Sequence, residues 1–538
     1  MQHSSGLLIA PQGELFYFQR ATTGQSHKKS GLLENHMKKT MPQQKSPTSI
    51  HHSFWLQDQP LDARYPELEE NHQTDVLIVG AGITGLSVAL ELLERGRQVT
   101  VCEASAIGAG TTGGSSGHLD AHPEMGPQAL LNQLGEEKAR DYTLMRLDAI
   151  RTIQNRCGEN SEFRSVEGYY YTEHEEALDD VKAEYEAAKK IGLSVNWTDQ
   201  VPVPRAVGGY AVQGMARIDC MSYLKSLAEL VVQKGGQIFE QTQVSGPVEP
   251  APRSLKTAAD HEIHFNQVVC AVHCNFTDFQ QLYLETPAYQ SYVLAVKVRD
   301  PLEDALFWDD SDPYFYIRRA TDDADLILVG GCDHRTGAGD TTASLKQLEE
   351  WTRERFQVES IISRWSAEFF EPTDGLPFIG KVGSKENVWI GTGFSGTGLT
   401  LGTAAGSMLA DLITGKSNSL TEELSPGRFN ITSAGKVISE GTTTAGNLAE
   451  RVLPAQKINA DTLQPGEGAV GKVDGKFAAV CRDRSGCVHT HSPICTHMGG
   501  VVQWNQAEQT WDCPVHGGRF SASGERLYGP PEKELEAE

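Results

Sequence analysis

Two mixed pairs of cysteine and histidine near the C-terminus could hold a metal centre. The first is Cys495-Thr496-His497, and the second, fifteen residues later, is Cys513-Pro514-Val515-His516. Two thiolates and two imidazoles can hold a [2Fe–2S] cluster, with the cysteines on one iron and the histidines on the other. A zinc site is the alternative, but zinc fingers pair Cys with Cys and His with His. The mixed pairs, each followed by a Gly-Gly turn, therefore favour the cluster.

This pattern resembles the motif of Rieske iron–sulfur domains. In high-potential Rieske centres, each cluster loop carries an extra cysteine and the second His is followed by hydroxyl groups, all of which raise the potential. This chain has Gly500 and Val515 in place of the cysteines, and Gly518 and Phe520 in place of the hydroxyls. The resemblance implies a low-potential, ferredoxin-like centre held by Cys495, His497, Cys513 and His516.

A dinucleotide-binding pattern begins at residue 75. A strand-like run over 75–79 is followed by Gly80-Ala81-Gly82-Ile83-Thr84-Gly85, by a helical pattern that ends near Gly96, and by a second strand that ends at Glu103. The glycines permit a tight turn and close approach of a pyrophosphate to the helix N-terminus, while Glu103 can bind ribose hydroxyls. A carboxylate at that position disfavours a 2′-phosphate, so we expect FAD or NAD. The binding residues expected here are Gly80, Gly82, Ile83, Thr84, Gly85 and Glu103.

The next segment, 107–119, is dense in Gly, Ser and Thr and is either a surface loop or a cofactor lining. Here the chain resembles the FAD-dependent amine and amino-acid oxidases (D-amino-acid oxidase, glycine and sarcosine oxidases). The resemblance implies that this segment runs along FAD through Gly110, Thr111, Thr112, Ser115, Ser116, Gly117 and His118. Metal binding by His118 and His122 is the competing interpretation, but it lacks a third ligand.

The same resemblance identifies two further FAD elements. Val244, at the end of the strand expected to begin at 237 and to end at 241–244, resembles the residue whose backbone meets the adenine. A strand at 387–390, a glycine-rich loop and a helix over 399–413 resemble the element at the pyrimidine end of the flavin, where the helix dipole stabilises negative charge. The loop residues implied are Gly393, Phe394, Ser395, Gly396, Thr397, Gly398 and Thr400. Several members of that family attach FAD through a cysteine shortly before the position of Asp374. Ala367 falls near that place and no cysteine does, so noncovalent FAD is expected.

Strands expected at 292–296, 314–318 and 326–330 predict an antiparallel sheet, which in the resembled family forms the substrate domain. Arg318, Arg319, His334 and Arg335 are candidates to bind a substrate carboxylate, although solvated charges at strand edges would give the same pattern. The candidate catalytic residues are His334, Arg335, Tyr316 and His118.

The fold class predicted is an α/β Rossmann-like FAD-binding domain with an antiparallel-sheet substrate domain, followed by a small all-β Rieske domain. We expect a disordered tail over 1–55, the oxidoreductase over 56–415, a linker over 416–457 and the Rieske domain over 458–538. The FAD-binding segments would be 72–125, 235–275 and 365–415, and the substrate domain 126–234 with 280–364.

Composition excludes several classes of protein. The net charge of −24 argues against nucleic-acid and anionic-membrane partners. The chain has neither an apolar run long enough for a membrane span nor a signal-peptide core. Its ten cysteines show no framework spacing, which favours the cytoplasm.

The expected function is that of an FAD-dependent dehydrogenase that oxidises a C–N bond of an amine or amino acid by hydride transfer. Electrons would then pass singly through the cluster to an external acceptor. The alternative is an electron-transfer or redox-sensing protein without small-molecule turnover. A Rieske hydroxylase is disfavoured, because no His pair with a nearby acid supplies a mononuclear iron site.

Overall fold

The computed structural model describes residues 53–57, 61–157, 163–246, 249–274, 277, 280–428, 446–447 and 456–538. Most of the expected tail and of the expected linker therefore lies outside the described residues. The described chain begins with a 3-10 turn, η1 (Phe54–Leu56), whose Trp55 is buried. None of the helices in the described ranges is long and apolar enough to cross a membrane.

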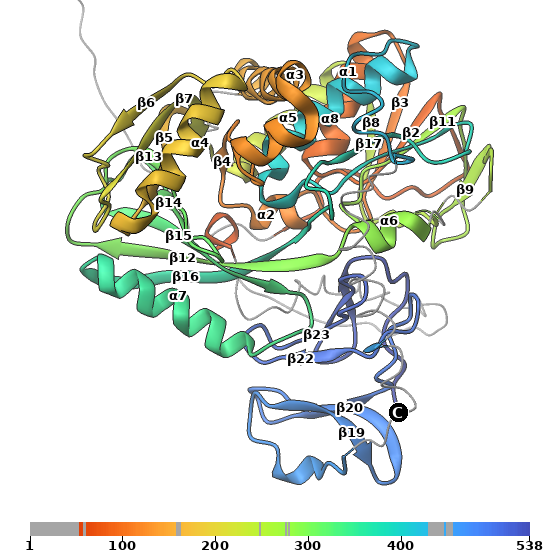
Figure 1. Cartoon of the computed structure of the whole chain (residues 1–538). Coiled ribbons are helices and arrows are strands. Elements are labelled where there is room, and N and C mark those ends of the chain that lie inside the picture. The colour runs from red at the N-terminus through yellow and green to blue at the C-terminus, as the bar shows by residue number, and fades with distance from the viewer. Residues whose placement is uncertain are drawn as a thin grey trace, which may run out of the picture. The chain divides into compact units, whose positions relative to one another are not determined.

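A six-stranded sheet forms the nucleotide-binding layer, in the order β17-β18-β11-β2-β3-β8 (Figure 1). Its strands are β2 (Val76–Val79), β3 (Val99–Cys102), β8 (Gln237–Phe239), β11 (Gln267–Cys270), β17 (Phe378–Lys381) and β18 (Val388–Thr392). All neighbours are parallel except β17, which is antiparallel to β18. The fully buried runs of β2 and β3 are typical of a parallel sheet covered on both faces.

Two helices from opposite ends of this module pack closely on each other. They are α1 (Ile83–Glu94) and α8 (Gly398–Ile413). Added Cβ atoms at Gly402 and Gly406 would come within 2.7 and 2.5 Å of Thr84 and Ser87 side-chain atoms. The small residues of α8 therefore allow the two glycine-rich loops that precede these helices to lie on one site.

A nine-stranded sheet forms the second layer, in the order β16-β12-β15-β14-β13-β5-β7-β4, with β6 also paired to β7. Its strands are β4 (His118–Leu119), β5 (Arg164–Thr172), β6 (Val195–Thr198), β7 (Gly208–Arg217), β12 (Ala288–Val298), β13 (Ala305–Asp309), β14 (Tyr316–Arg319), β15 (Leu326–Arg335) and β16 (Val358–Phe370). The predicted antiparallel pairing is present between β12 and β15 and between β14 and β15. The pair β13 and β5 is parallel, which the sequence did not indicate.

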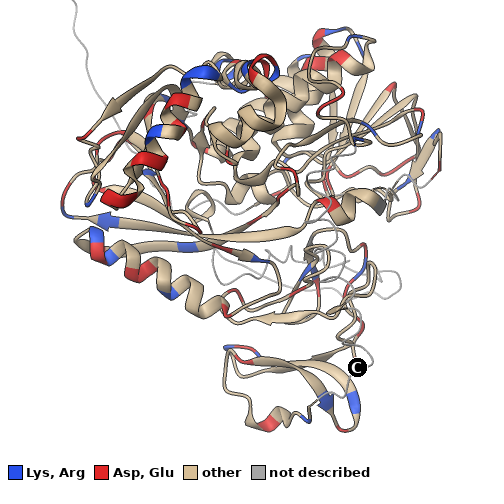
Figure 2. Cartoon of the chain, in the orientation of Figure 1, with Lys and Arg blue, Asp and Glu red and all other residues tan. Residues whose placement is uncertain are grey.

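Helices surround these layers (Figure 1). They are α2 (Thr111–Gly114), α3 (Pro127–Arg156), α4 (Leu178–Lys190) after a 3-10 turn η2 (Glu175–Ala177), α5 (Cys220–Gln233), α6 (Gln280–Glu285) and α7 (Thr341–Arg355). The long helix α3 is interrupted at Gly135, which has a positive φ of 72°. Acidic and basic side chains are interspersed along α7 (Figure 2), so its surface carries no single-sign patch.

Two of the expected boundaries differ from the structure. The third FAD-binding segment was expected to begin at residue 365, but this position lies inside β16, which pairs with β12 from Phe370 back to Val358. The strand ends only where the turn at Pro372–Asp374 begins. Residues 241–244, expected as a strand, form only a bridge between Val244 and Thr257.

The C-terminal module is all-β, as predicted. One sheet contains β19 (Gly468–Val473), β20 (Lys476–Arg482) and β21 (Val488–His491). The other contains β22 (Gln503–Asn505), β23 (Thr510–Asp512), β24 (Arg519–Ser521) and β25 (Arg526–Tyr528).

A small third sheet of the main module combines β1 (His72–Gln73), β9 (Ser254–Lys256) and β10 (Glu262–His264).

A buried polar network joins the C-terminal module to the nine-stranded sheet. Gln290 of β12 donates to Asp512 of β23 (3.1 Å), and Asn505 of β22 donates to Gln290 (3.2 Å). Asp512 also accepts from Arg519 (3.1 Å), and neither Gln290 nor Asp512 is solvent-accessible. A satisfied buried network of this kind favours one docked arrangement over others.

Candidate cofactor and substrate site

A cavity of about 900 Å³ lies between the two layers, and the predicted glycine-rich loops line it. Most of the predicted FAD residues line it: Gly80, Gly82, Ile83, Thr84, Glu103, Gly110, Thr111, Thr112, Ser115, Ser116, His118, Val244, Phe394, Ser395, Gly396, Thr397 and Gly398. This elongated set of loops at strand ends fits a dinucleotide.

Four predicted FAD residues do not belong to the lining. Gly85 packs against the Gly80 carbonyl, where a Cβ would approach to 1.9 Å. Gly117 and Gly393 adopt positive φ values of 79° and 70°. Thr400 is buried within α8, and its Oγ1 has no hydrogen-bond partner. The three glycines therefore shape the loops from behind the cavity.

The nucleotide end is organised around Glu103. Its carboxylate accepts hydrogen bonds from the Ala81 and Ser105 backbone amides, both at 3.0 Å. Burial raises the pKa of Glu103, while these two amides oppose the shift. The side chain is thereby fixed at the end of β3, as ribose recognition requires.

The opposite end of the cavity holds Glu124, which the sequence analysis missed. Its carboxylate accepts from the Gly396 amide (2.9 and 2.8 Å) and from the Tyr314 hydroxyl (3.0 Å). The surrounding cavity walls desolvate the Glu124 carboxylate and raise its pKa to about 8, and the neighbouring Glu371 adds to the shift. No sequence signal identified Glu124, because only the tertiary fold brings it to the loop before α8.

Two predicted catalytic residues, His118 and Tyr316, line this end and contact each other. Their rings are 5.3 Å apart with edge-to-face geometry. Burial, with a contribution from Arg318, lowers the pKa of His118 to about 3, so its imidazole is neutral. Tyr316 is hydrogen-bonded through Ser291 (3.1 Å), and Ser291 also bonds Asp333 of β15.

Asp333 is a second lining residue that the sequence analysis missed as a candidate. Its Oδ1 atom is inaccessible to solvent and has no hydrogen-bond partner. Burial raises the pKa of Asp333 to about 7, and Glu371 contributes to the shift.

The other two predicted catalytic residues lie away from the cavity lining. His334 stacks on Tyr292 and its Nδ1 contacts the Cys332 carbonyl (3.1 Å). Arg335 donates to the carbonyl of Pro514 in the C-terminal module (3.4 Å). Their placement does not support the predicted carboxylate-binding role.

Arg318 and Arg319 are also turned toward backbone. Arg318 is buried and donates to the carbonyls of Ser116 (2.6 Å) and Ile218 (3.2 Å), while Arg319 donates to that of Leu302 (2.6 Å). These two guanidinium groups brace loops, and neither lines the cavity.

The predicted cluster ligands come together on two loops with the same internal hydrogen bonds. The backbone amide of Cys495 donates to the carbonyl of Gly500, and the backbone amide of Cys513 donates to that of Gly518, each at 2.8 Å. The side chains of Cys495 and Cys513 are hydrogen-bonded to each other, and the His497 and His516 rings are 5.1 Å apart. Burial lowers the pKa of His497 to about 4 and that of His516 to about 3. Two adjacent thiols and two neutral imidazoles fit a [2Fe–2S] cluster.

A tyrosine of the main module covers both histidines. The Tyr283 hydroxyl lies 3.1 Å from Nε2 of His497, and its ring centroid is 4.4 Å from that of His516. Tyr283 belongs to α6, far from the cluster motif in sequence, and no sequence signal pointed to it.

Glu368 of β16 lies between the cavity and the second cluster loop. Its carbonyl accepts from Thr111 (3.0 Å), a predicted FAD residue, and Glu368 itself lines the cavity. A Cβ added to Gly517 would come 2.5 Å from Oε1 of Glu368. The cavity wall and the cluster loop are therefore in direct contact.

The C-terminal module also contributes Arg526 of β25 to the cavity lining. Its guanidinium interacts electrostatically with Cys274 and Glu103 at the nucleotide end, and its buried Nε has no hydrogen-bond partner. Arg526 is the one Lys or Arg among the described lining residues.

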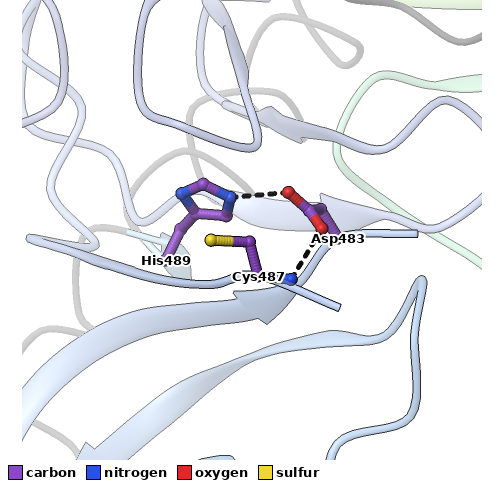
Figure 3. Close-up of side chains that lie close together, drawn as sticks. All are labelled: Asp483, Cys487 and His489. Atoms are coloured by element: carbon purple, nitrogen blue, oxygen red, sulfur yellow. Dashed lines mark hydrogen bonds and ion pairs between the residues drawn. The ribbon is translucent and has the colours of Figure 1, made fainter. Parts of the chain in front are cut away.

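A separate trio of possible ligands lies at the hairpin of β20 and β21 (Figure 3): Asp483 and Cys487 belong to the turn, and His489 belongs to β21. Asp483 accepts from Nε2 of His489 (2.8 Å), from the Cys487 amide (2.9 Å) and from Ser485 (2.6 Å). Although burial alone would raise it, these bonds lower the pKa of Asp483 to about 2. The carboxylate is satisfied within the turn, so the trio is explained by closure of the hairpin.

Both modules match families of known proteins. The family described as FAD dependent oxidoreductase matches residues 75–412, and that described as Rieske [2Fe-2S] domain matches residues 455–537. The chain is 32% identical over 495 residues to the Rieske 2Fe-2S iron-sulfur protein YhfW of Bacillus subtilis (strain 168), covering 90% of this chain and 96% of that protein. It is 24% identical to the gamma-glutamylputrescine oxidoreductase of Escherichia coli (strain K12), covering 66% and 86% of the two chains.

The crystal structure of glycine oxidase from Geobacillus kaustophilus has the fold of the main module. Its TM-score is 0.56 at 19% identity, and the match covers 67% of this chain and 100% of that chain. The predicted fold class is thus confirmed, and the cofactors are FAD and a [2Fe-2S] cluster.

Proposed function

The chain belongs to the FAD-dependent oxidoreductase family and carries a C-terminal Rieske domain, and from this premise we propose that it is an amine or amino-acid dehydrogenase. It would oxidise a C–N bond and pass the electrons through its own cluster to an external acceptor. Bound FAD supplies a two-electron acceptor for hydride, and the cluster supplies a one-electron carrier.

The observation that carries this proposal is the contact between the cavity wall and the cluster loop. Thr111 and Gly517 meet the same residue, Glu368, from its two sides. Tyr283 of the main module covers His497 and His516, so the two histidine rings that would hold the cluster lie against the FAD module. This arrangement favours electron transfer within one chain.

The chain's own residues would bind, orient and exclude water. Glu103 and the amides before α1 would hold the nucleotide, and the loop before α8 would hold the other end of the cofactor. The neutral His118 and Tyr316 form one wall of the reaction space. No general base is required, since a neutral amine can be oxidised by hydride transfer. The FAD is proposed to be noncovalent, with Ala367 at the position where a cysteine would attach it.

The test is anaerobic addition of amines and amino acids to the protein loaded with both cofactors. The expected result is bleaching of the flavin absorbance followed by the EPR signal of a reduced Rieske cluster. Flavin bleaching without a reduced cluster would contradict the internal electron path. Cys513→Ser is the control variant, because it should keep flavin bleaching and lose the EPR signal.

The second candidate is an electron-transfer or redox-sensing protein located, like the first, in the cytoplasm. None of the ten cysteines forms a disulfide, which supports a reducing compartment. Substitutions inside the cavity discriminate the two candidates. Loss of small-molecule turnover in such variants, with normal flavin and cluster spectra, would favour the enzyme.

A further inference from the structure

We propose that the substrate end of the cavity selects a substrate with a cationic group in addition to the reacting amine, such as a diamine or polyamine, and rejects an amino-acid carboxylate. This inference rests on the proposed amine oxidation and names its substrate class. Four features of the side chains that line the cavity support it.

The first is that, among the described lining residues, no Lys or Arg at the substrate end could bind a substrate carboxylate. Arg526 is their one Lys or Arg, and its electrostatic partners lie at the nucleotide end. The four basic residues predicted to bind a carboxylate are directed elsewhere: Arg318, Arg319 and Arg335 donate to backbone carbonyls, and His334 stacks on Tyr292.

The second is the excess of acidic groups. Eleven lining residues are Asp or Glu. At least five of them already have fixed partners. Asp120 pairs with Arg146 (2.8 Å) and Asp309 accepts from the Phe315 amide (2.7 Å). Other donors serve Glu103, Glu184 and Glu368. Glu124 and Asp333 face the cavity with acceptor capacity to spare, and Glu371 influences the charge of both.

The third is an acceptor atom without a donor. Asp333 lines the cavity, while its Oδ1 atom is inaccessible to solvent and has no hydrogen-bond partner. A buried carboxylate oxygen without a donor is costly, so native sites pair it. An ammonium group of a ligand beside Asp333 would compensate the charge of this carboxylate, whereas a ligand carboxylate would add like charge.

The fourth is the aromatic character of the same wall. Trp308, Tyr170, Tyr314 and Tyr316 line the cavity around these acids. Aromatic faces attract cations, and carboxylates combined with aromatic rings form a site suited to ammonium groups.

The chemistry balances with the cofactors already assigned. The neutral reacting amine loses a hydride from its α-carbon to FAD, while its nitrogen lone pair forms the C=N bond of an iminium ion. Water then hydrolyses this ion to a carbonyl compound and an amine. The second, protonated nitrogen takes no part in the redox step and serves only to anchor the substrate.

Three ligands with the same aminomethyl end test the inference: 1,4-diaminobutane, n-butylamine and 4-aminobutanoate. All three contain a 3-aminopropyl chain, and this chain ends in a protonated aminomethyl, a methyl or a carboxylate group. We expect 1,4-diaminobutane to bind the oxidised holoenzyme about 10-fold or more tightly than n-butylamine, and 4-aminobutanoate to bind weakest. Binding is read from the perturbed flavin spectrum, and turnover is read separately from anaerobic flavin reduction.

The two readouts separate the two proposals. Tight diamine binding without flavin reduction by any amine would support the cationic site and overturn the proposed amine oxidation. Flavin reduction by α-amino acids, with diamines binding no better than n-butylamine, would overturn the cationic site and leave amine oxidation standing.

Asp333→Asn and Glu124→Gln test the assignment residue by residue. Each should weaken 1,4-diaminobutane binding by about 10-fold and change n-butylamine binding by less than about 2-fold. Asp179→Asn, which removes the same charge from an exposed position on α4, should change neither. Equal weakening of both amines by Asp333→Asn, with FAD content unchanged, would overturn the role of this carboxylate in charge recognition.

Discussion

Asp333 and Glu124 titrate in an unusual range for carboxylic acids. Burial raises the pKa of Asp333 to about 7, and the cavity walls desolvate the Glu124 carboxylate and raise its pKa to about 8. Each acid is therefore neutral below its raised pKa and negative above it. Between pH 6 and 9 an alkylammonium group keeps its charge, because its pKa is about 10.

We therefore expect the dissociation constant of 1,4-diaminobutane to fall as pH rises from about 6 to about 9. Asp333→Asn should remove the part of this change that lies near pH 7. The measurement is a flavin-spectrum titration at a series of pH values, with n-butylamine as the reference ligand. A diamine affinity that weakens toward pH 9 would contradict the assignment of these two acids as cation acceptors.

Tyr283 is a second residue whose role can be tested, through its contact with a cluster ligand. Its hydroxyl oxygen lies 3.1 Å from Nε2 of the cluster ligand His497. A hydrogen bond that a ligand N–H donates to an acceptor makes the imidazole a better electron donor to the metal, which lowers the cluster potential. Tyr283→Phe should therefore raise the midpoint potential by about 40 mV, which corresponds to about 1 kcal/mol for a one-electron couple.

Redox titration followed by EPR measures this shift. Tyr169→Phe is the matched control, since it removes a tyrosine hydroxyl that instead contacts Glu167 (2.6 Å). An unchanged potential in Tyr283→Phe would show that the hydroxyl covers the histidine without tuning the cluster.

At the scale of elements, local patterns were predictable from sequence. The strand, glycine loop, helix and acid from β2 to Glu103 are contiguous, so their geometry follows from about thirty residues of chain. The two cluster loops are equally local. In contrast, β16 extends to Phe370 because it pairs along the whole of β12, and such pairing leaves no mark in its own sequence.

The residues that the sequence analysis missed share the same cause. Glu124, Tyr283 and Arg526 reach the site only through tertiary packing, each from an element whose local sequence has no binding pattern. Arg335 illustrates the opposite error. Its place at the end of a strand suggested substrate binding, but its side chain points to the second cluster loop.

The packing of the second cluster loop against β16 can be tested by substitution. Gly517 has a φ of 71°, and a Cβ there would come 2.5 Å from Oε1 of Glu368 and 2.8 Å from Cβ of Ala288. Gly517→Ala should therefore displace the loop from β16 and reduce cluster content or electron transfer from the flavin, while FAD content stays normal.

Gly486→Ala provides the control for backbone strain alone. Gly486 also has a positive φ, 91°, but an added Cβ there would meet no atom within 4 Å. Iron content, EPR amplitude and the rate of cluster reduction should thus change much less in Gly486→Ala. Equal effects in the two variants would contradict a specific role for the contact between Gly517 and Glu368.

At the scale of the whole molecule, a buried polar network and a shared cavity lining join the two modules. The buried network of Gln290, Asn505, Asp512 and Arg519 fixes the C-terminal module against the nine-stranded sheet. This docking brings β25 to the nucleotide end of the cavity. The FAD site of this chain thus includes side chains from both modules.

Arg526 makes this sharing measurable. Its guanidinium is largely buried, its Nε has no hydrogen-bond partner, and burial lowers its pKa while Cys274 and Glu103 oppose the shift. A charged group in this state is stabilised by an anion, and a dinucleotide brings a diphosphate that a guanidinium binds through paired hydrogen bonds. Arg526→Ala should therefore weaken FAD binding by about 10-fold or more. The FAD affinity of Arg526→Lys should lie between those of Arg526→Ala and the unsubstituted protein.

Titration of FAD into the FAD-free protein, followed by flavin fluorescence, measures this affinity. The EPR signal of the cluster serves as the internal check that the C-terminal module is folded. Arg484→Ala removes an exposed arginine from the same module and should leave FAD affinity unchanged. If Arg526→Ala keeps full FAD affinity with an intact cluster, the C-terminal module contributes only electron transfer. If it loses affinity as expected, docking of the Rieske domain and retention of FAD are coupled, because the module that carries the cluster ligands also completes the FAD site.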